Sequence, residues 1–316
     1  MLTAVLGLTG AIIFGSADFL GGLAAKRMSS LLVTAVAAAS GLVALLLALP
    51  FVAGVWSPSA VLWGALSGVS GAIAISLLYA CLAIGPMSIL SPLTAVVSAV
   101  VPMTVGLAGG DRLAPIGYWA LGLALVAVVL VGFVPERGAV RPSLLGALMA
   151  RGSGPLVGAV MVMIDLAPAD SGLVPLVLNR AVNATIMFSV VGLLALVSLR
   201  RRALLPASSA TATILAGSAA SAGSLGPATD AARTPRSTLA IGLRLAVACG
   251  VVDVVANVLM LLGMRAGDLS VMSVLTAMYP AGTILLAALV LKERIAPVQW
   301  LGLALALTAA GMLALA

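Results

Sequence analysis

The chain has 316 residues, of which 63% are hydrophobic and only 8% are charged, and its formal net charge is +7. A soluble domain carries about 25% charged residues, so this chain has too few to cover a surface that faces water. It contains no histidine, which excludes every histidine-dependent metal site or catalytic triad. The cysteines, Cys81 and Cys249, lie in separate apolar runs and predict neither a disulfide framework nor a metal motif.

A basic balance can indicate a nucleic-acid surface, but the Lys and Arg residues here sit mostly in short connections between apolar runs. This placement is typical of the positive-inside bias of membrane proteins. The first apolar run has no charged segment before it, and Lys26 and Arg27 follow it. We therefore interpret this run as a first spanning helix and not as a cleaved leader.

The rest of the chain continues this pattern of long apolar segments. Each is close to the ~20 residues that cross the hydrocarbon core of a bilayer, where only helices satisfy their own backbone groups. The ten predicted helices are Leu2–Ala24, Ser30–Val52, Ala60–Ile84, Ser88–Leu107, Ile116–Val134, Leu144–Leu166, Gly172–Leu199, Leu239–Met264, Leu269–Leu291 and Val298–Ala316. Residues 200–238, rich in Ala, Ser, Thr and Gly, are predicted to form a flexible linker.

An internal repeat relates the two halves of the chain. Ala83–Ala95 aligns with Arg265–Ala277, and Gly, Ser, Ser, Thr and Ala recur at a constant offset. At the same offset, Asp111-Arg112 and Glu293-Arg294 are each followed by a hydrophobic residue, Ala and Pro. Five helices per half is an odd number, so the second copy must enter the membrane in the opposite orientation. Such inverted repeats are typical of secondary transporters, whose solute site lies near the midplane.

The sequence therefore predicts an all-α membrane protein of ten transmembrane helices in two inverted five-helix repeats. The first repeat is predicted to span residues 1–136 and the second 142–316, with the flexible linker at 200–238 inside the second.

Several short sequences also match a known family. They are Phe14–Phe19, Tyr79–Pro92, Asp253–Asn257, Tyr279-Pro280, and Leu291–Arg294 with Gln299 and Gly302. With them the chain resembles the drug/metabolite transporter superfamily, EamA type, over nearly its whole length except the linker. The resemblance implies two five-helix repeats and the transport of amino acids, other metabolites or drugs. Arg151 and the long linker depart from the family pattern.

Charged side chains within the predicted helices are the first candidates for function. Each costs about 2.5–3.5 kcal/mol at a helix centre on insertion scales, so such residues are rare unless they act or pair. The deep ones are Asp18, Arg151, Arg180 and Asp253, and their formal charges sum to zero. This balance predicts that they pair with one another across the bundle.

Each of these residues has two interpretations. Asp18 either faces a cavity and binds a cation or a proton, or it neutralises an arginine. Asp253 and Asn257 are four residues apart and share a helix face, where they either line the cavity or clamp two helices. Arg180 either recognises an anion through its forked guanidinium or forms a structural salt bridge with Asp165 or Asp253.

The remaining candidates are Arg151 and two tyrosines. Gly152-Ser153-Gly154-Pro155 follows Arg151 and predicts a loosened or broken helix that frees backbone groups for a solute. Alternatively, Arg151 extends to the membrane interface or pairs with Asp18. Tyr79 and Tyr279 either stack on a solute or pack within the bundle. The Asp111-Arg112 and Glu293-Arg294 turns are predicted to be structural or gate-forming.

Two arguments about orientation disagree. The odd-numbered connections carry most of the Lys and Arg residues, whereas the even-numbered ones hold only Arg112 and Arg265. The positive-inside rule then places the odd connections in the cytoplasm and both termini outside. The family resemblance implies that both termini are inside.

These features together predict a secondary transporter in the cytoplasmic membrane, an exporter or exchanger of a small metabolite, amino acid or drug-like solute. Its partners are the solute, the lipid bilayer and, as candidate coupling ion, the proton, because carboxylates lie in the membrane and no nucleotide-binding motif is present. We expect no cofactor, no metal, no nucleic acid and no enzymatic activity. A flippase for a lipid-linked amphiphile and a non-transporting membrane scaffold are the alternatives.

Overall fold

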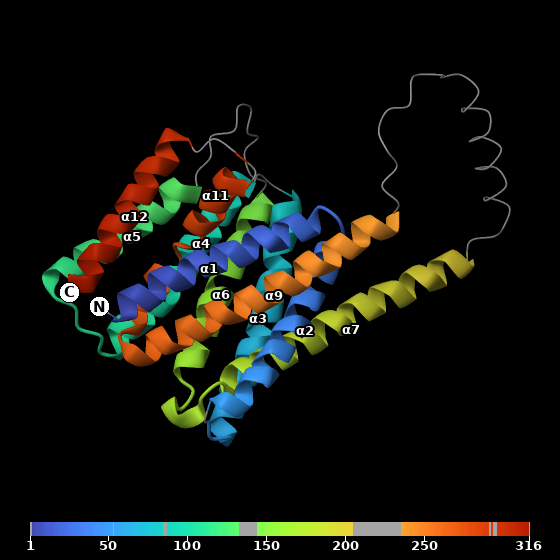
Figure 1. Cartoon of the computed structure of the whole chain (residues 1–316), viewed down its shortest axis with the longest axis horizontal. Coiled ribbons are helices and arrows are strands. Elements are labelled where there is room, and N and C mark those ends of the chain that lie inside the picture. The colour runs from blue at the N-terminus through green and yellow to red at the C-terminus, as the bar shows by residue number, and fades with distance from the viewer. Residues whose placement is uncertain are drawn as a thin grey trace.

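The computed structural model describes residues 2–52, 54–84, 87–132, 144–204, 235–290, 292 and 296–315. The regular elements among them are helices (Figure 1). In the first half of the chain they are α1 (Leu2–Ala25), α2 (Ser30–Ala48), the short 3-10 helix η1 (Leu49–Phe51), α3 (Pro58–Ile84), α4 (Met87–Gly109) and α5 (Pro115–Gly132). In the second half they are α6 (Leu144–Asp165), η2 (Ala169–Ser171), α7 (Val174–Leu204), α9 (Pro235–Ala266), α10 (Leu269–Thr276), α11 (Tyr279–Val290) and α12 (Pro297–Leu315).

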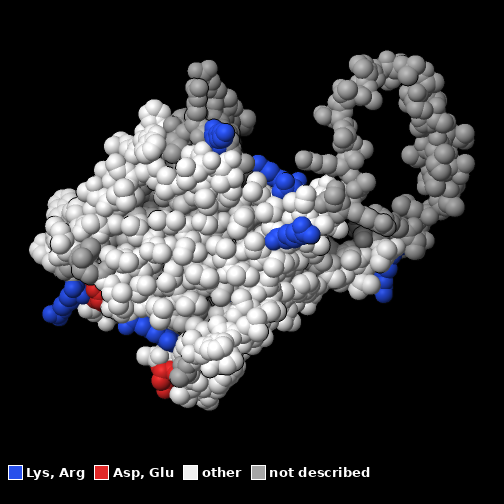
Figure 2. Space-filling model, in the orientation of Figure 1, with Lys and Arg blue, Asp and Glu red and all other residues white. Residues whose placement is uncertain are grey.

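Six helical stretches among the described residues are long and apolar enough to cross a membrane. They are Leu2–Ala25, Ser30–Phe51, Pro58–Leu77, Val174–Val197, Thr238–Ala266 and Leu269–Val290, and Thr94–Gly109, Pro115–Val131 and Pro297–Leu313 are shorter apolar helices. Figure 2 shows a broad uncharged surface over the bundle, with Lys, Arg and acidic side chains at its edges. A surface of this kind suits contact with lipid rather than with water.

The structure corrects the bounds of the predicted linker. Residues 200–204 complete α7, and residues 235–238 begin α9, so both ends of the predicted 200–238 segment are helical. Arginine is a good helix former, which lets Arg200, Arg201 and Arg202 extend α7 beyond its apolar part. Pro235 begins α9, a position where proline is favoured because its missing N–H is not needed. Residues 205–234 lie outside the described residues.

The predicted ninth helix is broken, and the predicted break in the sixth is absent. Proline at 280 has no N–H to donate to the carbonyl of Thr276, and the helix divides at Ala277 and Met278 into α10 and α11. In contrast, α6 runs through Pro155 without interruption. There Ser153 Oγ donates to the carbonyl of Ala74 at 2.9 Å, and this bond joins α6 to α3 close to the proline.

The helices pack in a pattern that crosses between the two halves of the chain. Helix α1 packs against α9 and α11, and α6 packs against α3 and α4. Helix α2 lies against α7 and α9, and α3 lies against α7. Helices α5 and α12 pack against each other, as do α4 and α10. Consequently, the most extensive helix contacts join one half of the chain to the other.

Glycines allow the closest of these contacts. A Cβ at Gly68 would lie 2.6 Å from the carbonyl oxygen of Asn179, and one at Gly250 would overlap the carbonyl oxygen of Ala37. Gly68 and Gly250 stand at the offset that relates Ser91 to Ser273, and each faces a helix of the other half. Small residues at such contacts let the two backbones approach closely, and this close packing promotes helix association in lipid.

The two ends of the bundle differ in charge. Asp111 lies within electrostatic range of Asp165 and Asp268, and together with Asp170 these residues define what we term the acidic end. Both chain termini lie at this end (Figure 1), where Thr3 contacts Gly267. The opposite end, termed the basic end, carries Lys26, Arg27, Arg200 and Arg244.

We predict that Gly250→Ala lowers the melting temperature of the purified protein in detergent. The added methyl group would overlap the backbone of α2 and force the helices apart, a change that typically costs about 1–3 kcal/mol. Gly192→Ala is the matched control, because nothing lies within 4 Å of a Cβ there. The control should keep or slightly raise the melting temperature through its better helix propensity. Equal effects of the two substitutions would contradict the close contact at Gly250.

Candidate functional site

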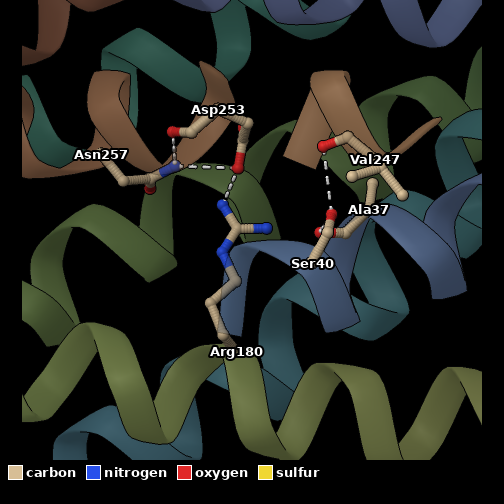
Figure 3. A network of polar contacts seen from close by, with 6 residues as sticks. All are labelled: Ala37, Ser40, Arg180, Val247, Asp253 and Asn257. Carbon is tan, nitrogen blue, oxygen red and sulfur yellow. Dashed lines mark hydrogen bonds and ion pairs between the residues drawn. The ribbon is translucent and has the colours of Figure 1, made fainter. Parts of the chain in front are cut away.

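An ion pair between Arg180 of α7 and Asp253 of α9 lies inside the bundle (Figure 3). The two side chains are 14% and 24% exposed, respectively. One turn further along α9, Asn257 Nδ2 donates to the Asp253 carboxylate at 3.2 Å and to the Asp253 carbonyl at 2.8 Å. The amide and the guanidinium donate to the same carboxylate oxygen, Oδ2. Of the two partners that the sequence suggests for Arg180, Asp253 is therefore the one it contacts.

The side chain of Arg180 reaches Asp253 by passing Gly41 of α2. A Cβ at Gly41 would lie 3.8 Å from Arg180 Cδ, 3.1 Å from the carbonyl oxygen of Gly250 and 2.9 Å from Val254 Cγ2. A larger side chain at this position would therefore crowd both the arginine and α9. Sequence reasoning missed Gly41, because isolated glycines are frequent in transmembrane helices and carry no signal of their own.

Ser40 fixes α2 at the same crossing. Its Oγ lies 3.3 Å from the carbonyl oxygen of Val247 on α9 and 3.1 Å from that of Ala37 on its own helix (Figure 3). The hydroxyl thus donates across the contact between α2 and α9, whereas the ion pair joins α7 to α9. Helices α2, α7 and α9 are held together at one level of the bundle by these polar contacts.

Asp18 lies on the inward face of α1 but is exposed. It follows Gly15 by three residues and Ala11 by seven, so it shares their face of the helix. Gly7, Ala11 and Gly15 are buried on that face, with Gly15 against Tyr279 and Thr283 of α11. Asp18 and then Gly22 are exposed, and nothing lies within 4 Å of a Cβ at Gly22. The exposed part of this face of α1 therefore runs from Asp18 to Gly22, toward the basic end, and we term this exposed face the crevice.

The predicted pairing of all four deep charges is wrong. Among the described residues, the ion pair of Arg180 with Asp253 is formed, and Asp18 and Arg151 have none. The reason is the packing, because α1 lies against α9 and α11 whereas α6 lies against α3 and α4. Arg151 is exposed on α6, and a Cβ at its neighbour Gly152 would lie 3.8 Å from Leu77 of α3.

Tyr279 and Cys249 lie near the aspartates. Both are within electrostatic range of Asp18, and Cys249 is also within range of Asp253 and Arg180. Tyr279 is half-buried at the first position of α11, directly after the break in the ninth predicted helix. Cys249 Sγ lies 3.2 Å from where a Cβ of Gly21 would be. The side chain of Tyr79, the other tyrosine candidate, lies outside the described residues.

A second polar contact joins α3 to α7. Asn179 Nδ2 donates to Ser67 Oγ at 2.9 Å, and Ser67 donates to the carbonyl of Gly64 at 2.7 Å. Asn183, one turn further along α7, is 3% exposed, and its Oδ1 has no hydrogen-bond donor among the described residues. This contact joins α7 to α3 rather than to α2, and it supports helix packing rather than the crevice.

The acidic end is closed by a contact between the two halves. Asp111 Oδ2 accepts a hydrogen bond from the backbone N–H of Ser270 at 3.0 Å and from Ser270 Oγ at 2.7 Å. Ser270 lies in the first turn of α10, where free N–H groups and the helix dipole favour a carboxylate. Gly110 has a positive φ of 116°, and this conformation turns the chain after α4 toward Ser270. The equivalent Glu293 lies outside the described residues.

The negative charge of Asp111 also affects the acidic groups near it. Burial, followed by the negative charge of Asp111, raises the pKa of Asp268 above its usual value. A group whose pKa is raised by folding binds a proton more readily in the folded state, so lowering the pH toward 3.8 stabilises the folded form through Asp268. Arg265 lies at the same end of the bundle, and its guanidinium donates to the carbonyl of Gly172 at 2.9 Å.

We predict that Arg180→Gln destabilises the protein more than the double substitution Arg180→Gln/Asp253→Asn does. The single change leaves the Asp253 carboxylate inside the bundle without its cation, which typically costs about 3–5 kcal/mol. The double change removes both charges and keeps hydrogen-bonding groups at both positions. Melting temperatures of the purified variants measure the difference. A double variant less stable than Arg180→Gln would contradict the pairing.

Comparisons with known proteins agree with this architecture. Among solved structures, 27 chains match. One, titled "Crystal structure of protein", aligns with 99% of this chain and 98% of its own length at 16% identity and a TM-score of 0.62, which supports the fold alone. No curated protein sequence matches. Residues 144–315, more than half of the chain, match the EamA-like transporter family. The chain therefore belongs to the EamA-like transporter family and is an integral, multi-pass membrane protein.

Proposed function

We propose that this protein is a secondary transporter that exports or exchanges a small solute across the cytoplasmic membrane by alternating access. The family is one of drug- and metabolite-type transporters in general. The observation that carries the specific proposal is the exposure of Asp18 on a helix face that is buried at Gly7, Ala11 and Gly15. A carboxylate with no ion pair among the described residues is tolerated at this depth when it faces water or a solute.

The helix packing supports two inverted five-helix repeats, at residues 1–136 and 142–316, as the basis of this mechanism. Exchanging each predicted helix for its counterpart in the other half turns the α1–α9 contact into the α6–α3 contact. It likewise turns α1–α11 into α6–α4 and α2–α9 into α7–α3, and it leaves α2–α7 and α5–α12 unchanged. A packing pattern that is unchanged by this exchange is expected of two equivalent bundles that rock against each other.

The state of the two ends supports export. The crevice opens toward the basic end, whereas Asp111 and Ser270 join the two halves at the acidic end. By the positive-inside rule the basic end faces the cytoplasm. In that orientation the crevice takes up its solute from the cytoplasm, and opening of the Asp111–Ser270 contact releases the solute on the far side.

Protons are the proposed coupling ion. Asp18 is accessible, lies inside the bundle and is within electrostatic range of Asp253. A carboxylate in this setting can take up and release a proton as the crevice changes sides. The chain contains no Walker-type nucleotide-binding motif, so an ion gradient rather than nucleotide hydrolysis is the proposed energy source.

The proposed function predicts solute flux in liposomes that contain the purified protein. Solutes are first selected by thermal shift from amino acids, polyamines, nucleosides and cationic drugs, because a ligand that binds the native fold raises its melting temperature. Flux of a selected solute should respond to an imposed pH gradient and fall at least tenfold in Asp18→Asn. A flux that does not depend on the pH gradient would contradict proton coupling. A flux equal to that of empty liposomes would contradict transport.

If the Asp111–Ser270 contact holds the acidic end closed, its removal should shift the population from the state closed at the acidic end to the state open there. Asp111→Ala removes a carboxylate from the start of α10, where such a group contributes about 0.3–2 kcal/mol. A cysteine placed at Gly22, in a background with Cys81 and Cys249 replaced by serine, reports exposure of the crevice to a membrane-impermeant maleimide. Labelling at position 22 should slow in Asp111→Ala, because the state closed at the acidic end becomes less populated.

Asp170→Asn is the matched control for this experiment. Asp170 is an exposed acid at the same end, and it is the backbone carbonyl of this residue, not its side chain, that accepts a hydrogen bond from Val55 at 2.9 Å. The control should label at the original rate. A rate unchanged by Asp111→Ala would show that the contact does not hold the acidic end closed.

A further inference from the structure

We propose that the crevice takes a solute that carries an ammonium or guanidinium group, and that Asp18 is the counter-ion of this group. The proposal rests on the function proposed above, in that it treats the crevice as the solute site. It adds the chemical class of the solute, and it follows from which charges of the bundle are already compensated and which are not.

The cations within the helices do not neutralise Asp18. Arg180 is held by Asp253, with Asn257 on the same carboxylate oxygen (Figure 3). Arg244 is exposed near the start of α9, at the basic end. Arg151 belongs to α6, whose main packing partners are α3 and α4, and it forms no ion pair among the described residues. Asp18 is therefore the one carboxylate on the described inner face of α1 and α9 whose charge is left for a ligand.

The residues around Asp18 suit a cation. Tyr279 lies within electrostatic range of Asp18, and aromatic rings attract ammonium and guanidinium groups through their negative faces. Gly22 continues the exposed inward face of α1 with no atom within 4 Å of a Cβ, so space for a solute adjoins the carboxylate. A carboxylate accepts hydrogen bonds from both kinds of cation with charge assistance.

The same arrangement disfavours an anion. A solute carboxylate or phosphate would need Arg180, whose guanidinium already donates to Asp253, and it would also meet the charge of Asp18. Like charges brought together in a poorly solvated site repel, and specificity arises as much from this repulsion as from attraction. Binding of an anion would therefore require the Arg180–Asp253 pair to break first.

The test is a binding experiment on the full-length purified protein. The probes share one carbon skeleton and differ in charge: 1,5-diaminopentane, 5-amino-1-pentanol, 1,5-pentanediol and pentanoate, with agmatine and spermidine as larger cations. Affinities are measured by thermal shift for the wild-type protein, Asp18→Asn, Asp18→Glu and Asp170→Asn. The last of these removes an exposed acid at the far end of the bundle and serves as the control.

We expect at least one cation to bind the wild-type protein at least tenfold more tightly than pentanediol and pentanoate. Asp18→Asn should lower the affinity for that cation at least tenfold. Asp18→Glu should restore part of this affinity, and Asp170→Asn should leave it unchanged. The proposal is overturned if no cation binds the wild type more tightly than it binds Asp18→Asn, or if pentanoate binds best.

The outcome separates this proposal from the transport function. Cation binding that depends on Asp18, without flux of the same cation in liposomes, would support the cation site and contradict transport. Flux of a neutral or anionic solute that is equal in wild type and Asp18→Asn would support transport and overturn the cation site. A pH-driven proton flux without any cation binding would leave Asp18 as a proton site and also overturn the proposal.

Discussion

A charge placed within a bilayer must be compensated or must face water, and this constraint organises the interior of the protein. Arg180 and Asp253 meet it by pairing, with Asn257 as an additional donor. Asp18 meets it by exposure on the inward face of α1. Since uncompensated charge at a helix centre costs several kcal/mol, the two solutions have different consequences. The paired charges hold helices together, whereas the exposed one remains free to bind.

Close backbone contacts make the paired arrangement possible. Arg180 reaches across α2 because position 41 is a glycine, and α2 approaches α9 closely because position 250 is also a glycine. Lipid offers no hydrophobic drive for helix association, so such contacts and the hydrogen bonds beside them stabilise the bundle. Packing and electrostatics at this site are therefore linked, because the small residues that let the helices meet also bring the charged groups within reach.

Hydrophobic runs predicted the helices well, because a bilayer imposes one length and one secondary structure on each. Prolines were harder to interpret: Pro155 was expected to loosen or break its helix but lies within a continuous α6, whereas α10 and α11 divide just before Pro280. The charged candidates could be named from sequence, but their pairing could not. Pairing depends on which helices pack together, and α1 and α6 lie against different neighbours. The contact of Asp111 with Ser270 was likewise hidden, because it joins residues far apart in the chain.

The two halves share their packing but not their charges. At the offset that relates Gly68 to Gly250, Asp253 corresponds to Gly71 and Asn257 to Ile75. A Cβ at Gly71 would lie 3.4 Å from Asn183 Nδ2, so an amide stands beside this glycine. The two deep carboxylates, Asp18 and Asp253, consequently lie on one wall of the bundle, formed by α1 and α9. Equivalent packing suits a scaffold that closes at either end. Carboxylates on a single wall suit a solute that stays bound to that wall while the opposite wall moves.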